Sequence, residues 1–163
     1  MPSTEGWVIY SCYGGNHTSP LAAGLHLGLI PWGQPLTLEA LERLPPFDRL
    51  TGADLGRLYL WGDGPYHHRV ATVGHGGRLS LVRAAVLSAM DAASGGQAAP
   101  TLWVDVYDLL TPLVRAGGFL SRRLGLTRPG RALLVAGLER IRPAVEARVA
   151  GVLAELARRA GEA

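Results

Sequence analysis

The chain has 163 residues, 48% of them hydrophobic and 18% charged, which is long and apolar enough to bury a core and excludes an intrinsically disordered chain. The net charge of +3 rests on sixteen arginines and no lysine, which excludes Schiff-base chemistry and a lysine that grips phosphate. The arginines are scattered among carboxylates, so we expect no binding to nucleic acid.

The single cysteine cannot form a disulfide within the chain, and the segment MPSTEGWVIY lacks the basic and long apolar regions of a signal peptide. Uncharged apolar runs fall well short of the roughly 18 residues that a transmembrane helix requires. We therefore expect a soluble, cytoplasmic protein with no membrane partner, built as one domain over residues 1–163. The sequence leaves its oligomeric state open.

A strand and two helices are predicted first. Residues 8–11 are mainly β-branched and aromatic, which is typical of a strand. Residues 19–29 favour a helix, with Ser19 in the capping position and Pro20 in the first turn, where a missing N–H costs nothing. Residues 37–44 favour a short helix that the following two prolines close.

A hairpin, a helix and a strand are predicted next. Residues 57–77 hold two strand-like runs on either side of the turn sequence Asp-Gly-Pro, which indicates a β-hairpin. Residues 79–90 carry apolar side chains at helical spacing, and residues 101–106 (TLWVDV) are typical of a strand. We expect Asp108 to cap a helix that runs toward the sequence GGFLSRRLGL.

The remainder of the chain is predicted to end in a helix. Gly117 and Gly118 indicate a break or a close approach of two backbones. Residues 132–137 (ALLVAG) fit a buried strand or the opening of a helix, and a final amphipathic helix is predicted from about Pro143. The fold class is therefore α/β, a three-layer sandwich with a mostly parallel sheet, one β-hairpin and a C-terminal helix.

The stretch CYGGNHTSP, residues 12–20, joins the first strand to the first helix at the edge of the sheet where α/β proteins bind ligands. Unpaired N–H groups and the dipole at a helix start attract anions. Gly14 and Gly15 would let the backbone fold around an anion, while Thr18 and Ser19 add hydroxyl donors. The alternative is a plain strand-to-helix turn with Ser19 as its N-cap.

Part of this loop can be aligned with a Walker A motif, GxxxxGK[ST]. Residues 16–18 (NHT) stand where GK[ST] would stand, which puts His17 in the lysine position and Thr18 in the position of the magnesium-binding hydroxyl. Both motif glycines and the lysine are missing from their places. Asp105 ends an apolar run in the manner of a Walker B strand, and the alternative is that it caps or turns the chain.

The same loop resembles that of the low-molecular-weight protein tyrosine phosphatases, whose pattern is Cys, five residues, Arg, Ser and usually Pro. In this register Cys12 is followed by YGGNH and then by TSP. The resemblance implies that Cys12 is a thiolate nucleophile supported by the hydroxyl of Ser19. Thr18 replaces the arginine of that family and the chain has no Asp-Pro general acid, so Arg122 or Arg123 would have to supply the charge. The alternative is that Cys12 is a small buried residue.

Three stretches carry a longer resemblance: IYSCYGGNHTSPLAAGLHLGLIP, a PPFD segment, and GGFLSRRLGL followed by GRALLVAG. Together they resemble the domain of unknown function 3189 family of Firmicutes over most of residues 7–137, with HTS where HSS is more usual. The resemblance implies no activity. It does imply that the opening loop and residues 117–126 belong to one design, in which Arg122 and Arg123 could supply the positive charge that the loop lacks.

The five histidines do not predict a metal site. His67 and His68 are adjacent, so on a strand they point to opposite faces, and no HExxH or cysteine pair accompanies them. We expect them to be exposed on the hairpin and His26 to pack on the first helix. His17 differs because it lies within the loop, where it could bind an anion when protonated or act as a base toward Cys12.

The sequence supports three hypotheses of function. The first is binding of an anionic small molecule, a phosphate-bearing compound or a nucleotide, at the loop. The second is an enzyme that uses Cys12 covalently, with His17 as its other catalytic residue, and the third is a non-catalytic regulatory or interaction protein. The sequence names no cofactor and does not decide whether the protein is an enzyme. The candidate ligand-binding residues are Gly14, Gly15, Asn16, Thr18, Ser19, Asp105, Arg122 and Arg123.

Overall fold

The computed structural model describes residues 6–162, and residues 1–5, on which the interpretation of a missing signal peptide partly rests, lie outside this range. Within it, no helix combines the length and the hydropathy that a bilayer span requires. The strands are β1 (Gly6–Cys12), β2 (Tyr59–Gly64), β3 (His68–Gly74) and β4 (Thr101–Asp105). The helices are α1 (Thr18–His26), α2 (Leu38–Glu42), α3 (Leu79–Ala93), α4 (Pro112–Arg122) and α5 (Thr127–Glu162), with short 3-10 turns η1 (Gly52–Asp54) and η2 (Tyr107–Leu109).

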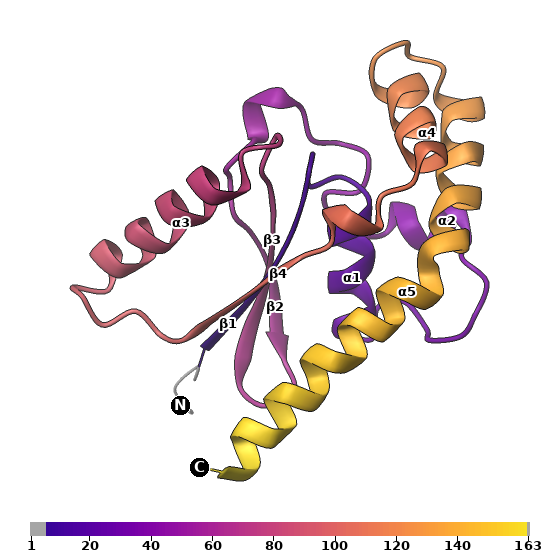
Figure 1. Ribbon diagram of the computed structural model, residues 1–163. Helices are drawn as coiled ribbons and strands as arrows, with labels where there is room; N and C mark the ends of the chain where they lie inside the picture. The colour runs from indigo at the N-terminus through magenta and orange to yellow at the C-terminus, as the bar shows by residue number, and fades with distance from the viewer. Residues whose placement is uncertain (1–5, 163) are drawn as a thin grey trace.

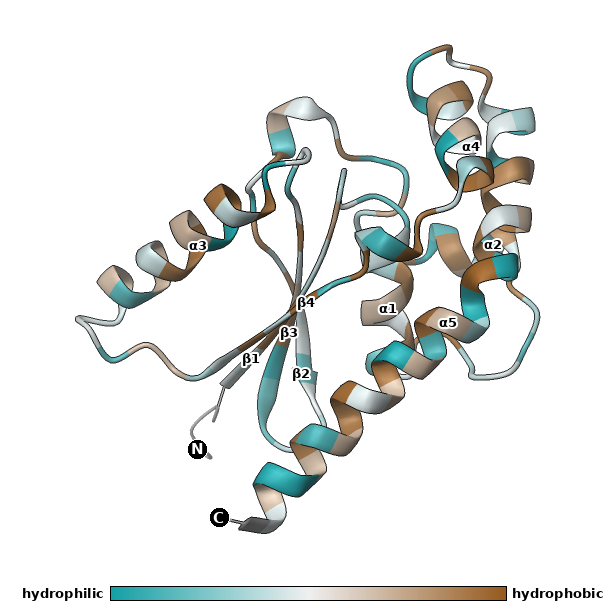
Figure 2. Ribbon diagram, in the orientation of Figure 1, coloured by the Kyte–Doolittle hydropathy of each residue, from teal (hydrophilic) through white to brown (hydrophobic). Residues whose placement is uncertain are grey.

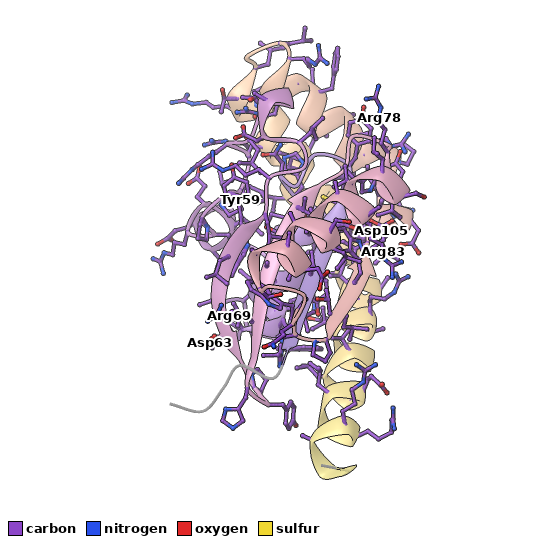
Figure 3. The ribbon with its side chains drawn as sticks, turned by 90° about the vertical axis from the view of Figure 1, so that its left-hand side faces the viewer. Tyr59, Asp63, Arg69, Arg78, Arg83 and Asp105 are labelled. Carbon is purple, nitrogen blue, oxygen red and sulfur yellow. The ribbon has the colours of Figure 1, made fainter. Side chains whose placement is uncertain are left out.

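The four strands form one sheet in the order β2-β3-β1-β4. β1 runs parallel to both of its neighbours, β3 and β4, whereas β2 pairs with β3 in the antiparallel sense. Arg69 and Asp63 face each other across this hairpin at 4.0 Å and mark it in the view from the α3 side (Figure 3). The predicted mostly parallel sheet with one hairpin is confirmed.

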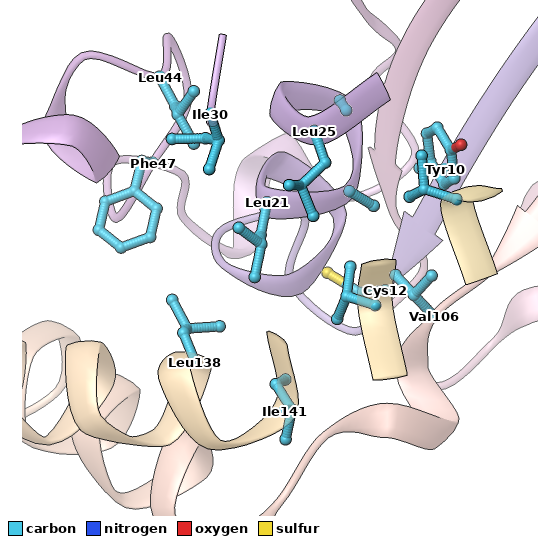
Figure 4. Close-up of a cluster of buried hydrophobic side chains, with 14 of the residues drawn as sticks. Tyr10, Cys12, Leu21, Leu25, Ile30, Leu44, Phe47, Val106, Leu138 and Ile141 are labelled. Atoms are coloured by element: carbon cyan, nitrogen blue, oxygen red, sulfur yellow. The ribbon is translucent and has the colours of Figure 1, made fainter. Parts of the chain in front are cut away.

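Helices cover both faces of the sheet, with α3 on one side and α1 and α5 on the other (Figure 1). Side chains alternate along β1, so Tyr10 and Cys12 join the large core beneath α1 and α5, while Ile9 packs under α3 with a smaller cluster. Figure 4 shows how Leu21 of α1 and Leu138 of α5 meet in the large core. The three-layer α/β class is confirmed.

Of the two alternatives for residues 132–137, the helix is correct and the strand is wrong, and the prediction that a final helix begins near Pro143 is also wrong. Both segments belong to the continuous helix α5, which holds Pro143 in its interior. Hydrophobic and hydrophilic residues alternate along this helix (Figure 2). A Cβ placed on Gly117 would lie 2.7 Å from the backbone nitrogen of Leu134, so α4 and α5 touch through their backbones. Residues 132–137 are apolar because they pack in this helical hairpin.

Two predicted helix caps are also wrong. Asp108 does not cap α4, because Pro112 takes the first helical position behind Thr111, and Asp108 instead accepts a 2.8 Å hydrogen bond from Arg148. Ser19 does not cap α1, which begins one residue earlier with His17 in the N-cap position.

The prediction that both hairpin histidines are exposed fails for His68, which is buried on β3. The hydroxyl of Tyr10 lies 2.8 Å from Nδ1 of His26, and Nε2 of His26 lies 2.7 Å from Nε2 of His68. Gly64 makes room for this contact, since a Cβ there would approach Nε2 of His68 to 2.7 Å. Burial, and then the neighbouring His68, lowers the pKa of His26 from 6.5 to about 4.

Candidate functional site

A pocket of about 710 Å³ opens at the carboxyl end of β1. Its lining residues come from three segments, the loop 12–18, the region 50–55 around η1, and the region 107–123 that contains η2 and α4. The predicted pair of segments, the opening loop and residues 117–126, therefore meets in one place. Of the predicted site residues, the pocket is lined by Cys12, Gly14, Asn16, His17, Thr18, Arg122 and Arg123, but not by Gly15, Ser19 or Asp105.

The backbone of the loop uses its acceptors and leaves its donors free. The carbonyls of Cys12 and Tyr13 accept hydrogen bonds from the segment after β3, and the carbonyl of Asn16 accepts one from the N–H of Asp48. By contrast, the N–H groups of residues 14–19 donate to no acceptor within residues 6–162. A run of unpaired N–H groups that ends in a helix start is the arrangement that attracts an anion.

Two contacts hold the loop in this shape. Gly15 has a φ of +70°, and a Cβ on it would lie 3.0 Å from the backbone nitrogen of Gly74, so this position requires glycine. The amide side chain of Asn16 accepts from the N–H of Leu50 at 2.8 Å and donates to its carbonyl at 3.1 Å. Gly15 and Asn16 therefore act as supports of the loop, and Asn16 also forms part of the pocket wall.

Asp48, which the sequence analysis did not single out, ties the loop to the helical hairpin. Its carboxylate accepts hydrogen bonds from Nε2 of His17 at 3.1 Å, the hydroxyl of Ser121 at 2.6 Å and Nε of Arg131 at 3.3 Å. Burial raises the pKa of Asp48, but the hydrogen bonds from His17, Ser121 and Arg131 outweigh it, so the pKa lies below its usual value. In the sequence analysis Asp48 appears only as part of the PPFD segment that carries the family resemblance, and the sequence gives no sign of its hydrogen-bond partners.

The carboxylate of Asp48 fixes the ring of His17. Since an ionised carboxylate only accepts, Nε2 of His17 carries the proton of that hydrogen bond. On α4, Gly118 faces this ring. A Cβ on Gly118 would lie 3.0 Å from Cε1 of His17, so the ring packs directly against the helix. His17 is thus held in the pocket wall between Asp48 and α4, as a polar group of the loop.

Cys12 and Thr18 lie at the buried end of the pocket. The sulfur of Cys12 is 3.1 Å from the hydroxyl of Ser19 and belongs to the large apolar core near Leu21 and Val106 (Figure 4). Thr18 is fully buried, and its hydroxyl oxygen has no hydrogen-bond partner. An unpaired buried hydroxyl is costly, so one beside a pocket indicates a group that a ligand would satisfy.

Arg122 and Arg123 reach the pocket from the end of α4. The guanidinium of Arg122 donates to the backbone carbonyls of Asp48 at 2.9 Å and Leu50 at 2.8 Å. The side chain of Arg123 makes no hydrogen bond or ion pair with any residue from 6 to 162. The two arginines therefore place positive charge in the same pocket wall as the loop, as expected from the sequence. None of the described side chains in the pocket wall is a carboxylate.

Asp105 ends β4 outside the pocket wall, in a polar cluster at the same edge of the sheet. It accepts a 2.7 Å hydrogen bond from the hydroxyl of Ser11, which in turn accepts from the indole of Trp103. Nε2 of His75 is 3.4 Å from the Asp105 carboxylate. Figure 3 shows Asp105 in the view from the α3 side. Within residues 6–162, no group of three or more His, Cys, Asp or Glu side chains is arranged to hold a metal ion.

Fold and site together define a mixed α/β protein with a pocket at the carboxyl edge of a mostly parallel sheet. The family model described as "Protein of unknown function (DUF3189)" matches residues 7–153, so the chain belongs to this family. The match includes both the loop after β1 and α4, and it confirms the family expected from the sequence. No curated protein and no solved structure matches the chain.

Proposed function

We propose that this protein binds a phosphate-bearing small molecule or nucleotide in the pocket beside the loop after β1. The observation that carries the proposal is the backbone of residues 14–19, whose N–H groups have no acceptor within the described chain while neighbouring carbonyls of the loop are engaged. N–H groups of this kind bind an anion with charge-assisted hydrogen bonds.

The unpaired hydroxyl of Thr18 supports the proposal independently of the backbone. It lies in the wall of the same pocket and is shielded from water, so a bound anion would relieve the cost of an unmade hydrogen bond. Arg122 and Arg123 supply the positive charge that neither lysine nor a loop arginine provides here. Binding that depends on these charges weakens as salt rises.

The test is the substitution Thr18→Val, which removes the hydroxyl and keeps the shape of the side chain. Titration with inorganic phosphate, followed by calorimetry, is expected to give an affinity about tenfold lower for the variant, the loss of one hydrogen bond to a charged group. Without phosphate the variant should be at least as stable as the unmodified protein, because no protein hydrogen bond is lost. A matched control is Thr111→Val, whose hydroxyl is also buried and unpaired but lies outside the pocket wall.

A second candidate function is covalent chemistry at Cys12, as in the phosphatases that its loop resembles. The hydroxyl of Ser19, 3.1 Å from the sulfur, is placed to donate to a thiolate, and Cys12 forms part of the pocket wall. Iodoacetamide should then modify native Cys12 faster than urea-unfolded Cys12 at pH 7, and phosphate should slow the reaction. A thiol that reacts only after unfolding would assign Cys12 to the core. If phosphate also fails to bind, a non-catalytic interaction protein is left.

A further inference from the structure

The wall of the pocket formed by α4 is strongly cationic. Arg115 and Arg122 lie seven residues apart on one face of this helix, and Arg123 follows at its end. Gly118 lies between them on the same face, where its missing side chain makes room for the ring of His17 to pack against α4. All three guanidinium groups therefore belong to one side of one pocket.

None of these three charges is neutralised by a carboxylate in the described chain. Arg122 donates only to backbone carbonyls, and Arg115 donates to the hydroxyl of Tyr107 at 2.8 Å and lies 5.5 Å from the centre of that ring. The guanidinium of Arg123 has no polar partner within residues 6–162. The nearby carboxylate of Asp48 is already bonded to Arg131 and His17.

A single phosphate leaves much of this pocket unused. The free N–H groups of residues 14–19 and the hydroxyl of Thr18 provide enough donors for one phosphoryl group. The arginines of α4 form a separate group of donors on a different segment of the wall. The volume of about 710 Å³ falls in the range of roughly 300–1,000 Å³ that holds an organic ligand.

Three large apolar side chains of the pocket wall are exposed to solvent. Tyr13, Leu55 and Phe119 are 51%, 41% and 55% exposed, and all three belong to the pocket wall. A single exposed apolar side chain needs no explanation, but three in the wall of one pocket indicate a binding surface. Two of them are aromatic, and rings stack on flat organic groups.

We propose that the ligand is a nucleoside diphosphate, with one phosphoryl group at residues 14–19, the second at Arg122 and Arg123, and the base against Tyr13 and Phe119. This inference rests on the proposed function, since it needs the loop to bind one phosphoryl group. It adds that the α4 arginines recognise a second anion and that the exposed rings recognise a base.

Calorimetric titration at constant ionic strength with inorganic phosphate, pyrophosphate and ADP tests each part. Pyrophosphate should bind at least about tenfold more tightly than phosphate, and ADP more tightly than pyrophosphate. The substitution Arg123→Gln should remove most of the advantage of pyrophosphate over phosphate and weaken phosphate itself much less, and the side chain that it replaces makes no hydrogen bond or ion pair within residues 6–162. Phe119→Ser should weaken ADP alone. Arg83→Gln on α3, another exposed arginine, serves as the control and should change nothing (Figure 3).

The outcomes separate this inference from the function on which it rests. Equal affinities for phosphate and pyrophosphate, both in the unmodified protein and in Arg123→Gln, overturn the diphosphate and leave phosphate binding standing. Pyrophosphate that binds more tightly than ADP overturns the base contact. If phosphate, pyrophosphate and ADP all fail to bind, the proposed function falls and the inference falls with it.

Discussion

Acid should destabilise this protein through His26. The ring of His26 is buried between Tyr10 and His68, and burial, followed by the charge of His68, lowers its pKa from 6.5 to about 4. In the unfolded chain the pKa returns to about 6.5, so between pH 6.5 and pH 4 the unfolded state binds more protons than the native state. The contribution of His26 is therefore fully present above pH 6.5 and is lost as the pH falls toward 4.

The size of the effect follows from the two pKa values. At about 1.4 kcal/mol for each pH unit, the interval from 6.5 to about 4 corresponds to about 3 kcal/mol of unfolding free energy. Burial lowers the pKa of His68 as well, so its contribution has the same sign. A domain of ordinary stability has about 5–15 kcal/mol in total, so the loss is readily measured.

Urea unfolding followed by tryptophan fluorescence at pH 7.5, 6.5, 5.5 and 4.5 measures the slope of the unfolding free energy against pH. The substitution His26→Gln should flatten it, whereas the control His67→Asn, at an exposed position of the hairpin, should keep the slope of the unmodified protein. The comparison is between slopes, so a constant loss of stability in either variant does not affect it. Equal slopes for His26→Gln and the unmodified protein would refute the reasoning. Asp48, whose pKa lies below 3.8, acts at lower pH and does not interfere.

Two further predictions concern the helical hairpin and its attachment. Asp48→Asn should lower the unfolding free energy by about 3 kcal/mol, because the buried carboxylate accepts hydrogen bonds from His17, Ser121 and Arg131. Asp63→Asn at an exposed ion pair should cost under about 1 kcal/mol in the same urea titration. Gly117→Ala should destabilise the protein by about 1–3 kcal/mol, because its Cβ would meet the backbone of α5. Gly151→Ala, with open space around it, should raise the unfolding free energy by as much as about 1 kcal/mol. Thermal melts that move in the same direction for both glycine variants would contradict the packing of α4 on α5.

The sheet could be predicted because its signals are local. Residues 8–11 and 101–106 are β-branched and aromatic, and the hairpin carries its own turn residues, so strand positions follow from short windows of sequence. Residues 132–137 lack such a signal, because a short apolar run suits a buried strand and a packed helix equally. Pro143 led to the wrong start for the final helix, because proline favours the first turn of a helix. In this protein it lies inside the long helix α5.

The residue that organises the site could not be found from the sequence for a different reason. Asp48 is a single carboxylate after two prolines, and its partners His17, Ser121 and Arg131 are 31, 73 and 83 residues away. Local patterns carry no information on contacts at such separations. The loop itself was predictable because glycines, hydroxyls and a helix start follow one another within nine residues.

The position of β1 in the middle of the sheet governs when this molecule can become compact during synthesis. β1 is the first strand to leave the ribosome, yet its two neighbours are β3 and β4, and the bond from Ser11 to Asp105 spans 94 residues. At about 5–20 residues per second, the central strand waits about 5 to 20 s for its last partner. Until β3 emerges, this segment, which is rich in valine, isoleucine and aromatic residues, has two open edges, and until β4 emerges it has one. The nascent chain is therefore most prone to aggregate before β4 emerges, and the pocket is among the last features to form.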